Sequence, residues 1–311
     1  ILAQGVNEYL YISRSCERMP VYRAAATAFA LAMSAQQFLA ALRTERLPPL
    51  QHPFPKPIPL NGTHFARVWQ NVLDRLESGD ETVKDYLVHI SEDFITAYDG
   101  YHKSQVHVLA IPRMRVDNAR SLTKDHLPML FRLAAYCTWL QEELAAQHPQ
   151  LTWRHGVHAN PSCSQLHVHI ISQDFHSPSM KNAKHWNSFQ PPFLVPVQEL
   201  VGNLLQEGSQ GALGDLSKEA AEALLKGPLV CGGCGADFGN GMAKLRKHYP
   251  GCWPRHSMQP PLPLILDLQA QNQAALLDDS GGAAAGESKS ASAERKRKSE
   301  DVIDLSSEDT E

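Results

Sequence analysis

The sequence lacks several features that would assign it at once to a class of proteins. No apolar run is long enough to cross a bilayer: the most apolar early stretch, residues 24–33, is far shorter than the ~20 residues that a membrane helix needs. An excess of one charge is also absent, because 29 Lys and Arg against 33 Asp and Glu give a formal net charge of −4. We therefore expect no membrane contact, and any surface for nucleic acid must come from local basic clusters.

Cysteine is scarce as well. Cys16, Cys137 and Cys163 stand alone, and the other three of the six cysteines gather near the C-terminal end of the folded region. This distribution excludes a small disulfide-stapled scaffold and favours a reducing compartment.

Composition divides the 311 residues into four regions. Residues 1–62 form an N-terminal extension, alanine-rich and helical in pattern, which ends in a proline-rich linker at 48–59 where neither a helix interior nor a central strand is possible. A catalytic domain is expected at 63–200 and a small cysteine-containing module at 201–256. The remaining residues, 257–311, are predicted to be a disordered tail, which from Gly281 onward turns to Gly, Ala, Ser and charge.

Periodicity in the second region indicates an α+β fold with an antiparallel sheet. Helical spacing runs from Phe65 to Leu73 and closes at Gly79, and Thr123 is expected to cap a long helix that reaches Leu144. Alternation of apolar residues predicts strands at 86–90, 106–110, 153–159 and 166–171.

The last of these strands carries the most informative pattern. On a strand, Gln165, His167 and His169 share one face, while the apolar residues between them fill the other. Two chemistries suit such a pair of imidazoles: attack of a neutral ring on phosphorus, or coordination of zinc. Polar residues on a half-exposed strand are the plainer alternative.

The flanking sequence resembles a known family. The stretch Gln165–Ala183 with His185-Trp-Asn-Ser-Phe189 is similar to the histidine-triad (HIT) signature, His-φ-His-φ-His-φ-φ, and specifically to its aprataxin branch in a fungal-like variant. His155–Ser162 and Tyr98–Pro112 extend the likeness, which covers roughly residues 65–255. One departure is that Gln165 stands at the first triad position, where histidine is usual.

This resemblance implies a HIT-type sheet with flanking helices and a DNA-repair reaction. Aprataxins remove AMP from abortive 5′-adenylated DNA ends, in single-strand break repair, through a covalent adenylyl-histidine. Carried onto this sequence, His167 is the nucleophile, His158 and His169 bind phosphate oxygens and assist the leaving group, and Lys181 neutralises developing charge. No catalytic metal is expected.

Nucleotide and DNA contacts are also implied by the resemblance. Tyr98, Asp99 and Tyr101 match the region that lines the adenine and ribose pocket, and Trp69 resembles an aromatic residue that stacks on the terminal base pair, although a core tryptophan is the alternative. Ser172 and Gln173 lie where they can donate hydrogen bonds to phosphate, although ordinary loop capping accounts for them equally well. The remaining expected contacts are Lys103, His107 and Gln165.

A second motif, Cys231-x2-Cys234-x13-His248-x3-Cys252, predicts one structural zinc ion per chain. A redox Cys-x-x-Cys is the competing interpretation, but it normally opens a helix in a βαβ unit. His256 is a less favoured fourth ligand. Aprataxins carry a finger after the HIT domain, and the basic residues Lys244, Arg246 and Lys247 on its helix suit phosphate contact, or simply form a solvated face.

Two other functions stay open at this stage. A HIT hydrolase or phosphoramidase of small nucleotides is disfavoured by the finger and the extension through Phe189. A nick-binding protein without catalysis is made plausible by Gln165. RNA–DNA junctions remain an alternative substrate to nicked, adenylated DNA, with AMP as the product in either case.

The tail holds two short motifs. Arg295-Lys-Arg-Lys298 is a compact basic cluster of the kind that importins read, so we expect nuclear localisation. Val302–Leu305, followed by acidic residues, resembles a SUMO-interacting motif that adds a strand to a partner's sheet, although a merely solvating acidic tail is the alternative.

Overall fold

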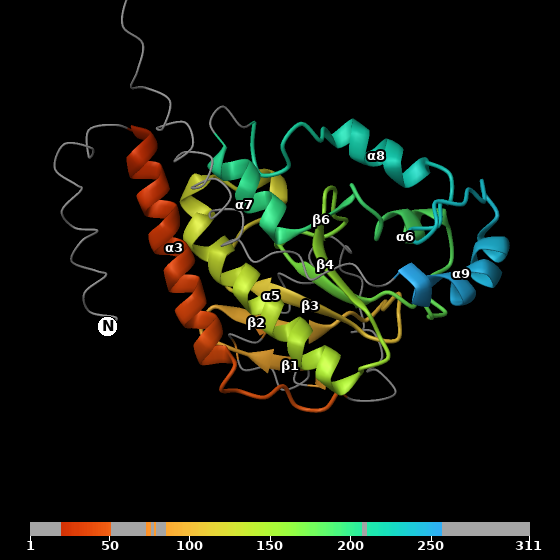
Figure 1. Cartoon of the computed structure of the whole chain (residues 1–311), viewed down its shortest axis with the longest axis horizontal. Helices are drawn as coiled ribbons and strands as arrows, with labels where there is room; N and C mark the ends of the chain where they lie inside the picture. Colours follow the sequence, from red (N-terminus) through yellow and green to blue (C-terminus); the bar gives the residue numbers. More distant parts are fainter. Residues whose placement is uncertain (1–19, 51–72, 76–77, 79–84, 207–209, 257–311) are drawn as a thin grey trace, which may run out of the picture. The chain divides into compact units, whose positions relative to one another are not determined.

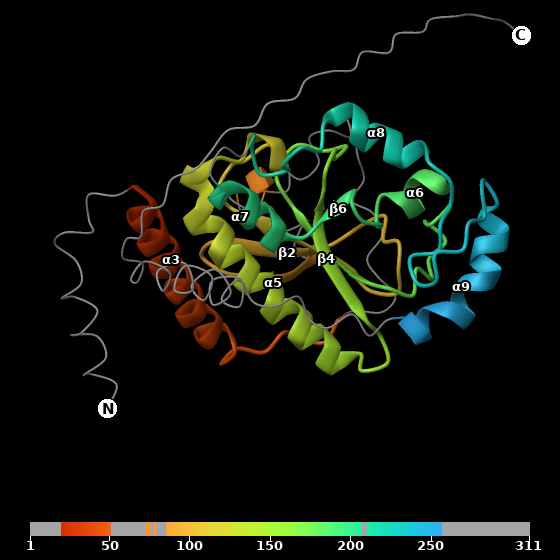
Figure 2. The same cartoon turned by 45° about the horizontal axis from the view of Figure 1, so that its top comes forward.

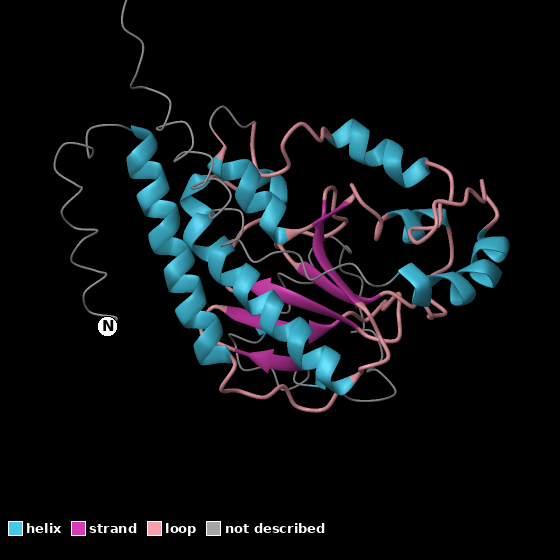
Figure 3. Ribbon diagram, in the orientation of Figure 1, coloured by secondary structure: helices cyan, strands magenta, loops and turns pink. Residues whose placement is uncertain are grey.

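The computed structural model describes residues 20–50, 73–75, 78, 85–206 and 210–256 of the chain. Its helices are α3 (Pro20–Leu42), α5 (Leu127–Gln147), α6 (Ala183–Asn187), α7 (Val197–Leu205), α8 (Lys218–Lys226) and α9 (Met242–His256). Its strands are β1 (Leu87–Ile90), β2 (Phe94–Tyr98), β3 (His107–Pro112), β4 (Trp153–His158), β5 (Val168–Ser172) and β6 (Leu194–Val195) (Figures 1 and 3). Among the described helices, none is both long and apolar enough to span a membrane.

The six strands form one sheet in the order β1-β2-β3-β5-β4-β6, and every paired neighbour is antiparallel. This arrangement confirms the predicted α+β class. Strand β5 lies between β3 and β4, and all five of its residues are buried. Pairing on both sides fixes the register of β5, so the side chains that it carries are held rigidly.

Two predicted boundaries are wrong. Strand β5 begins at Val168 rather than at 166, and Gln165 has a φ of 74°, in the left-handed region that a strand cannot use. Helix α5 begins at Leu127 with a proline in its first turn, whereas Thr123 precedes a separate short 3-10 helix, Lys124–His126. A proline suits the first turn of α5, because the backbone N–H groups of a first turn have no partner within the helix and the N–H that proline lacks is not needed.

Helices α5 and α3 belong to one core. Leu130, Phe131 and Leu140 of α5 are almost completely buried, and α3 runs alongside α5 in both views (Figures 1 and 2). Leu39 and Leu42 of α3 join the same apolar cluster as β2, β3 and β5. The region predicted as an extension therefore contributes to the core of the domain that holds the sheet.

Polar contacts continue this attachment beyond the end of α3. Arg43 forms an ion pair with Glu142, and the backbone N–H groups of Leu47 and Leu50 donate to side chains of α5. The expected helix at 65–73 lies largely outside the described residues; the described residues 73–75 are helical.

Candidate active site

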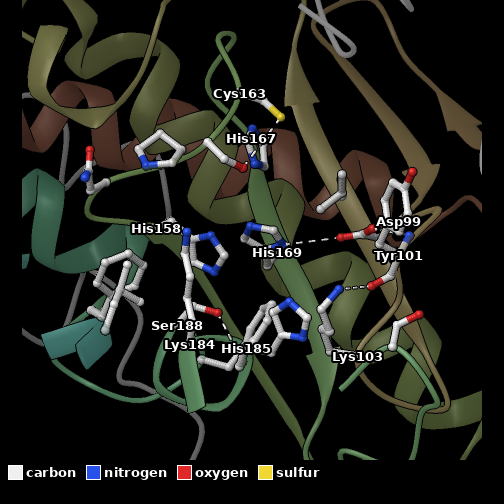
Figure 4. A pocket seen from close by; sticks show the side chains of 18 of the residues that line it. Asp99, Tyr101, Lys103, His158, Cys163, His167, His169, Lys184, His185 and Ser188 are labelled. Atoms are coloured by element: carbon white, nitrogen blue, oxygen red, sulfur yellow. Dashed lines mark hydrogen bonds and ion pairs between the residues drawn. The ribbon is translucent and has the colours of Figure 1, made fainter. Parts of the chain in front are cut away.

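A cavity of about 790 Å³ opens beside the start of β5 (Figure 4). Its walls come from the end of β2, the end of β4, the turn before β5, the segment 179–189 and helix α8. Eight of the predicted site residues line it: Tyr98, Asp99, Tyr101, Lys103, His158, His167, His169 and Lys181. Residues that are far apart in the sequence therefore lie around one cavity, as the predicted active site requires.

The hydrogen bond made by His167 leaves its other ring nitrogen free to act as a nucleophile. Its Nδ1 lies 2.8 Å from the carbonyl oxygen of Gln165, which only accepts, so Nδ1 carries the proton and Nε2 presents a lone pair. Burial lowers the pKa of His167, although the Gln165 carbonyl and Asp99 act in the opposite direction. The ring is therefore neutral near pH 7, as attack on phosphorus demands.

Gln165 does not contact the cavity through its side chain. Its amide donates to the carbonyl oxygens of Pro112 (2.8 Å) and Met114 (3.0 Å), and the residue is 3% exposed. The prediction that Gln165 shares a strand face with His167 is wrong, because the left-handed backbone turns its side chain toward the end of β3. Its backbone carbonyl, rather than its amide, serves the site.

A chain of hydrogen bonds fixes the tautomer of His169. The backbone N–H of Lys103 donates to Nδ1 of His107, so the proton of the neutral His107 ring is on Nε2, 2.9 Å from Nδ1 of His169. His169 consequently accepts at Nδ1 and carries its own proton on Nε2. His107, predicted to contact nucleotide, instead lies behind the cavity wall and orients the histidine that lines it.

The pKa values of these buried rings keep the hydrogen-bond chain neutral. Burial lowers the pKa of His107 to about 4, and burial followed by repulsion from neighbouring histidines lowers the pKa of His169 well below its ordinary value. Both rings therefore act as neutral donors and acceptors at pH 7.

Asp99 adds a carboxylate to the same wall. Its Oδ2 lies 3.5 Å from His107 Nε2 and 4.0 Å from His169 Nδ1 (Figure 4). Burial opposes ionisation of Asp99, but His107, Lys103 and the N–H of Tyr101 outweigh it and hold the pKa below the usual range. These three side chains lie close enough to hold a metal ion, yet the direct His107–His169 hydrogen bond occupies the nitrogens that would bind it.

His158 completes the group of histidines. Its ring centroid lies 4.1 Å from that of His169, and Phe189 packs edge-on against both rings. Burial, followed by charge on His167 and His107, lowers the pKa of His158 well below its usual value. In the described part of the chain, Nε2 of His158 and Nε2 of His169 are buried without a hydrogen-bond partner, so both suit a ligand in the cavity.

Ser172 and Gln173, which were also predicted to donate to phosphate, form hydrogen bonds within the protein instead. The Ser172 hydroxyl contacts Asp174 Oδ1 at 2.5 Å and the Val106 carbonyl at 3.1 Å. The Gln173 amide donates to the carbonyl of Ile171. Neither side chain lines the cavity, which corrects their assignment in favour of the loop-capping alternative.

Several lining residues were missed by the sequence analysis. Ser162, Lys184 and His185 fall inside or beside the quoted motifs, so the resemblance was a signal that could have identified them. Glu222 and Lys226 of α8 gave no such signal, because this helix reaches the cavity only through tertiary packing. Trp69 lies outside the described residues.

The second motif forms a compact donor set. The ligand atoms of Cys231, Cys234, His248 and Cys252 all lie within 4.8 Å of one another. The sulfurs of Cys231 and Cys252 are 3.7 Å apart, close to the ~3.8 Å that two ~2.3 Å zinc–sulfur bonds at a tetrahedral angle produce. These four residues therefore fit a structural zinc ion.

The surroundings of this donor set disfavour a redox pair. Cys231 follows an isolated β-bridge between Val230 and Asp237 rather than opening a helix. Lys244 and Lys247 are exposed on α9, and their contact with DNA remains a prediction.

Two protein-family models match separate parts of the chain. Residues 70–185 match the family described as the scavenger mRNA decapping enzyme C-terminal binding region. Residues 190–255 match a C2HE, C2H2 or C2HC zinc-binding finger, in agreement with the donor set above.

Several similar proteins are aprataxins or aprataxin-like proteins, the branch that the sequence motifs resemble. Aprataxin from Danio rerio is 34% identical over 161 residues, which are 52% of this chain and 48% of that protein. An aprataxin-like protein from Saccharomyces cerevisiae is 27% identical over 212 residues, 58% of this chain and 94% of its own. The solved aprataxin ortholog of Schizosaccharomyces pombe is 25% identical, with a TM-score of 0.47 over 58% of this chain and 88% of its own.

The extent of these matches differs between relatives. The chain spans about half the length of the vertebrate relatives that it matches. The sequence matches to aprataxins and aprataxin-like proteins confirm the resemblance that the motifs indicated.

Proposed function

We infer that this chain, an aprataxin-type protein of the histidine-triad superfamily, is a hydrolase that removes AMP from 5′-adenylated DNA ends. One observation supports this most strongly: a fixed tautomer leaves Nε2 of His167 as a free lone pair in a cavity where His158 and His169 offer buried nitrogens. A lone pair beside hydrogen-bonding groups is the arrangement that nucleophilic attack on a phosphate requires.

The cavity offers separate places for the parts of the substrate. Tyr98 and Leu109 provide an apolar wall for adenine, and the Asp99 carboxylate can accept from ribose hydroxyls. Nε2–H of His169 donates to an oxygen of the AMP phosphate, and His158 contacts a second one. The exposed lysines 181, 184 and 226 lie where the phosphate of the DNA end would emerge.

The reaction follows in two displacements. Nε2 of His167 attacks the phosphorus of AMP, so an N–P bond forms as the P–O bond to the DNA 5′-phosphate breaks. The DNA leaves as a phosphate whose charge the lysines stabilise, and His167 keeps its Nδ1 proton on the Gln165 carbonyl. Water then attacks the phosphorus and releases a proton to solvent as the N–P bond breaks, so AMP departs and the neutral imidazole returns. In this reaction the side chains and water act without a catalytic metal ion.

Recognition of DNA is assigned to the basic rim and the zinc module. Lys244 and Lys247 are exposed on α9, where lysine side chains can neutralise backbone phosphates without reading sequence. The four ligands of the zinc site, Cys231, Cys234, His248 and Cys252, hold this helix in place when the ion is bound.

Nuclear localisation through residues 295–298 and SUMO binding through Val302–Leu305 remain predictions, because both segments lie outside the described residues. The choice between DNA ends and RNA–DNA junctions also stays open.

One comparison separates this function from its alternatives. Steady-state hydrolysis is measured on nicked duplex DNA with a 5′-adenylate and on a small adenylated amine, with binding to the same nick lacking AMP as a third measurement. We expect a much higher kcat/KM on adenylated DNA. Equal values on both substrates would indicate a small-nucleotide hydrolase, and binding without turnover would indicate a non-catalytic nick-binding protein.

A further inference from the structure

The segment 173–189 supplies much of the cationic side of the cavity. It leaves β5 and contributes Ser179, Lys181, Lys184 and His185 to the lining. Apart from the short helix α6, it has no regular secondary structure. The position of its lysines therefore depends on contacts with other parts of the chain.

Helix α9 of the zinc module holds this segment at two points. The Tyr249 hydroxyl donates to the carbonyl oxygen of Gln173 at 2.8 Å, and the Arg246 guanidinium donates to the carbonyl oxygen of Met180. Both side chains come from the helix that also carries His248 and Cys252.

The contact at Met180 acts directly on Lys181. The Met180 carbonyl and the Lys181 N–H belong to the same peptide group. Arg246 binds its oxygen, while Nδ1 of His185 accepts from its N–H at 3.1 Å. The peptide plane is thus fixed from both sides, once by the zinc module and once by α6, and this orients the Lys181 side chain.

Apolar packing links the same two parts. Met180 and Trp186 are 1% and 2% exposed, and they share a cluster with Leu245, Tyr249 and the zinc-site cysteines 231 and 252. The rings of Trp186 and Tyr249 meet edge-on with centroids 4.7 Å apart, and the Trp186 indole N–H donates to the Val230 carbonyl, next to Cys231. Loss of order around the metal ligands would reach the segment through these contacts.

We propose that the zinc module positions the active site: Arg246 and Tyr249 hold the segment 173–189 so that Lys181 faces the cavity. The module then serves catalysis as well as DNA contact, and release of zinc lowers turnover on a substrate that contains no DNA. Arg246 is a positioning residue that acts through Lys181. This inference rests on the proposed function for its substrate, but not on DNA as the leaving group.

The test uses the full chain loaded with zinc and adenosine 5′-phosphoramidate, so that DNA affinity cannot contribute. Arg246→Met keeps the aliphatic stem and removes the donors. Losing this charge-assisted hydrogen bond should lower kcat about tenfold, with KM within about twofold and one zinc per chain retained. Arg246→Lys should restore part of kcat. Arg46→Met removes another arginine that donates to backbone carbonyls but does not line the cavity, and should leave kcat unchanged.

A double-mutant cycle identifies the path of the effect. In a Lys181→Met background, Arg246→Met should cause little further loss, because the residue that it positions is gone. Additive losses, or unchanged kcat in Arg246→Met, would overturn the proposal.

Hydrogen exchange provides a readout that does not depend on activity. Amides of residues 177–188 should exchange faster both in Arg246→Met and after zinc is chelated from the wild-type protein, while amides of β3 stay protected. Unchanged protection in both samples would contradict the coupling, even if a variant proved too unstable to assay. Failure of the proposed function would look different: wild-type protein would not act on adenylated DNA, while the exchange difference persisted.

Discussion

At the scale of single residues, the two nitrogens of each histidine have different tasks. His167 donates from Nδ1 to a backbone carbonyl and presents the lone pair of Nε2 to the cavity, whereas His169 accepts from His107 at Nδ1 and presents an N–H. The sequence motif was sufficient to predict that His167 and His169 lie together, and their ring centroids are 5.0 Å apart, although His167 comes just before β5 rather than on it. The motif did not predict the position of the Gln165 side chain. Alternation of polar and apolar residues gives no sign of a positive φ at a non-glycine residue.

The structural role of Gln165 gives the first prediction. Gln165→Glu keeps the size of the side chain but removes both donors from the carbonyls of Pro112 and Met114. The unfolding free energy should fall by about 2–3 kcal/mol, because buried acceptors lose their partner and face a carboxylate. Urea denaturation measures this loss, and KM for the adenylated substrate should stay within about twofold. A large rise in KM at unchanged stability would restore Gln165 to the nucleotide contacts.

Buried histidines predict a loss of stability in mild acid. The pKa of His107 is about 4 in the folded protein and near 6.5 when unfolded, so between these values only the unfolded chain takes up the proton. Stability should be complete above pH 6.5 and decline as the pH falls toward 4, by as much as ~3 kcal/mol from His107 alone.

Urea unfolding at several pH values, with circular dichroism as the signal, checks this. His107→Gln should flatten the decline, whereas replacing the exposed His176 with Gln should not. An identical pH dependence in wild type and His107→Gln would remove His107 as its cause.

At the scale of elements, the periodicity of the sequence predicted individual helices and strands. It did not reveal how these elements pack against one another. The long apolar face of α5 and the strands β3 and β4 were foreseen because each has its own local pattern. The spacing of Cys231, Cys234, His248 and Cys252 similarly predicted a zinc site. Nothing local showed that α8 lines the cavity or that α9 binds the segment after β5, because both depend on contacts between distant residues.

The zinc site predicts the outcome of removing one ligand. Cys252→Ser replaces a thiolate by a weaker ligand in a four-residue set, so zinc should be lost during dialysis against a mild chelator that wild type resists. Metal analysis measures the retained zinc. Cys137→Ala, which alters a buried cysteine remote from the set, should retain the ion. Full retention in Cys252→Ser would point to another fourth ligand, such as His256.

At the scale of the whole molecule, the folded core extends beyond the two matched family regions. Those regions cover residues 70–185 and 190–255, whereas α3 lies before both and still packs into the main core. The alanine-rich pattern of residues 1–47 predicted a helix there, but a helical pattern alone does not reveal which surface a helix covers. The attachment of α3 to α5 therefore had to come from the structure.

This attachment predicts a contrast within one helix. Leu39 is 3% exposed against the core, so Leu39→Ala should lower the unfolding free energy by about 2–4 kcal/mol. Phe29, which is 52% exposed on the same helix, should tolerate replacement by Ala with a change below ~1 kcal/mol. Thermal unfolding of the two variants provides the comparison, and equal midpoints would show that α3 does not stabilise the domain.

The central claim is that His167 carries AMP during the reaction, and one measurement tests it most directly. Wild-type protein is mixed with an excess of 5′-adenylated nicked DNA, quenched on the millisecond scale and digested, and the peptides are analysed by mass spectrometry. The account predicts a burst of released DNA 5′-phosphate, equal in amount to AMP attached to the peptide that contains His167. In His167→Ala both signals should disappear while binding to nicked DNA persists. AMP found on another residue, or full turnover by His167→Ala, would contradict the account.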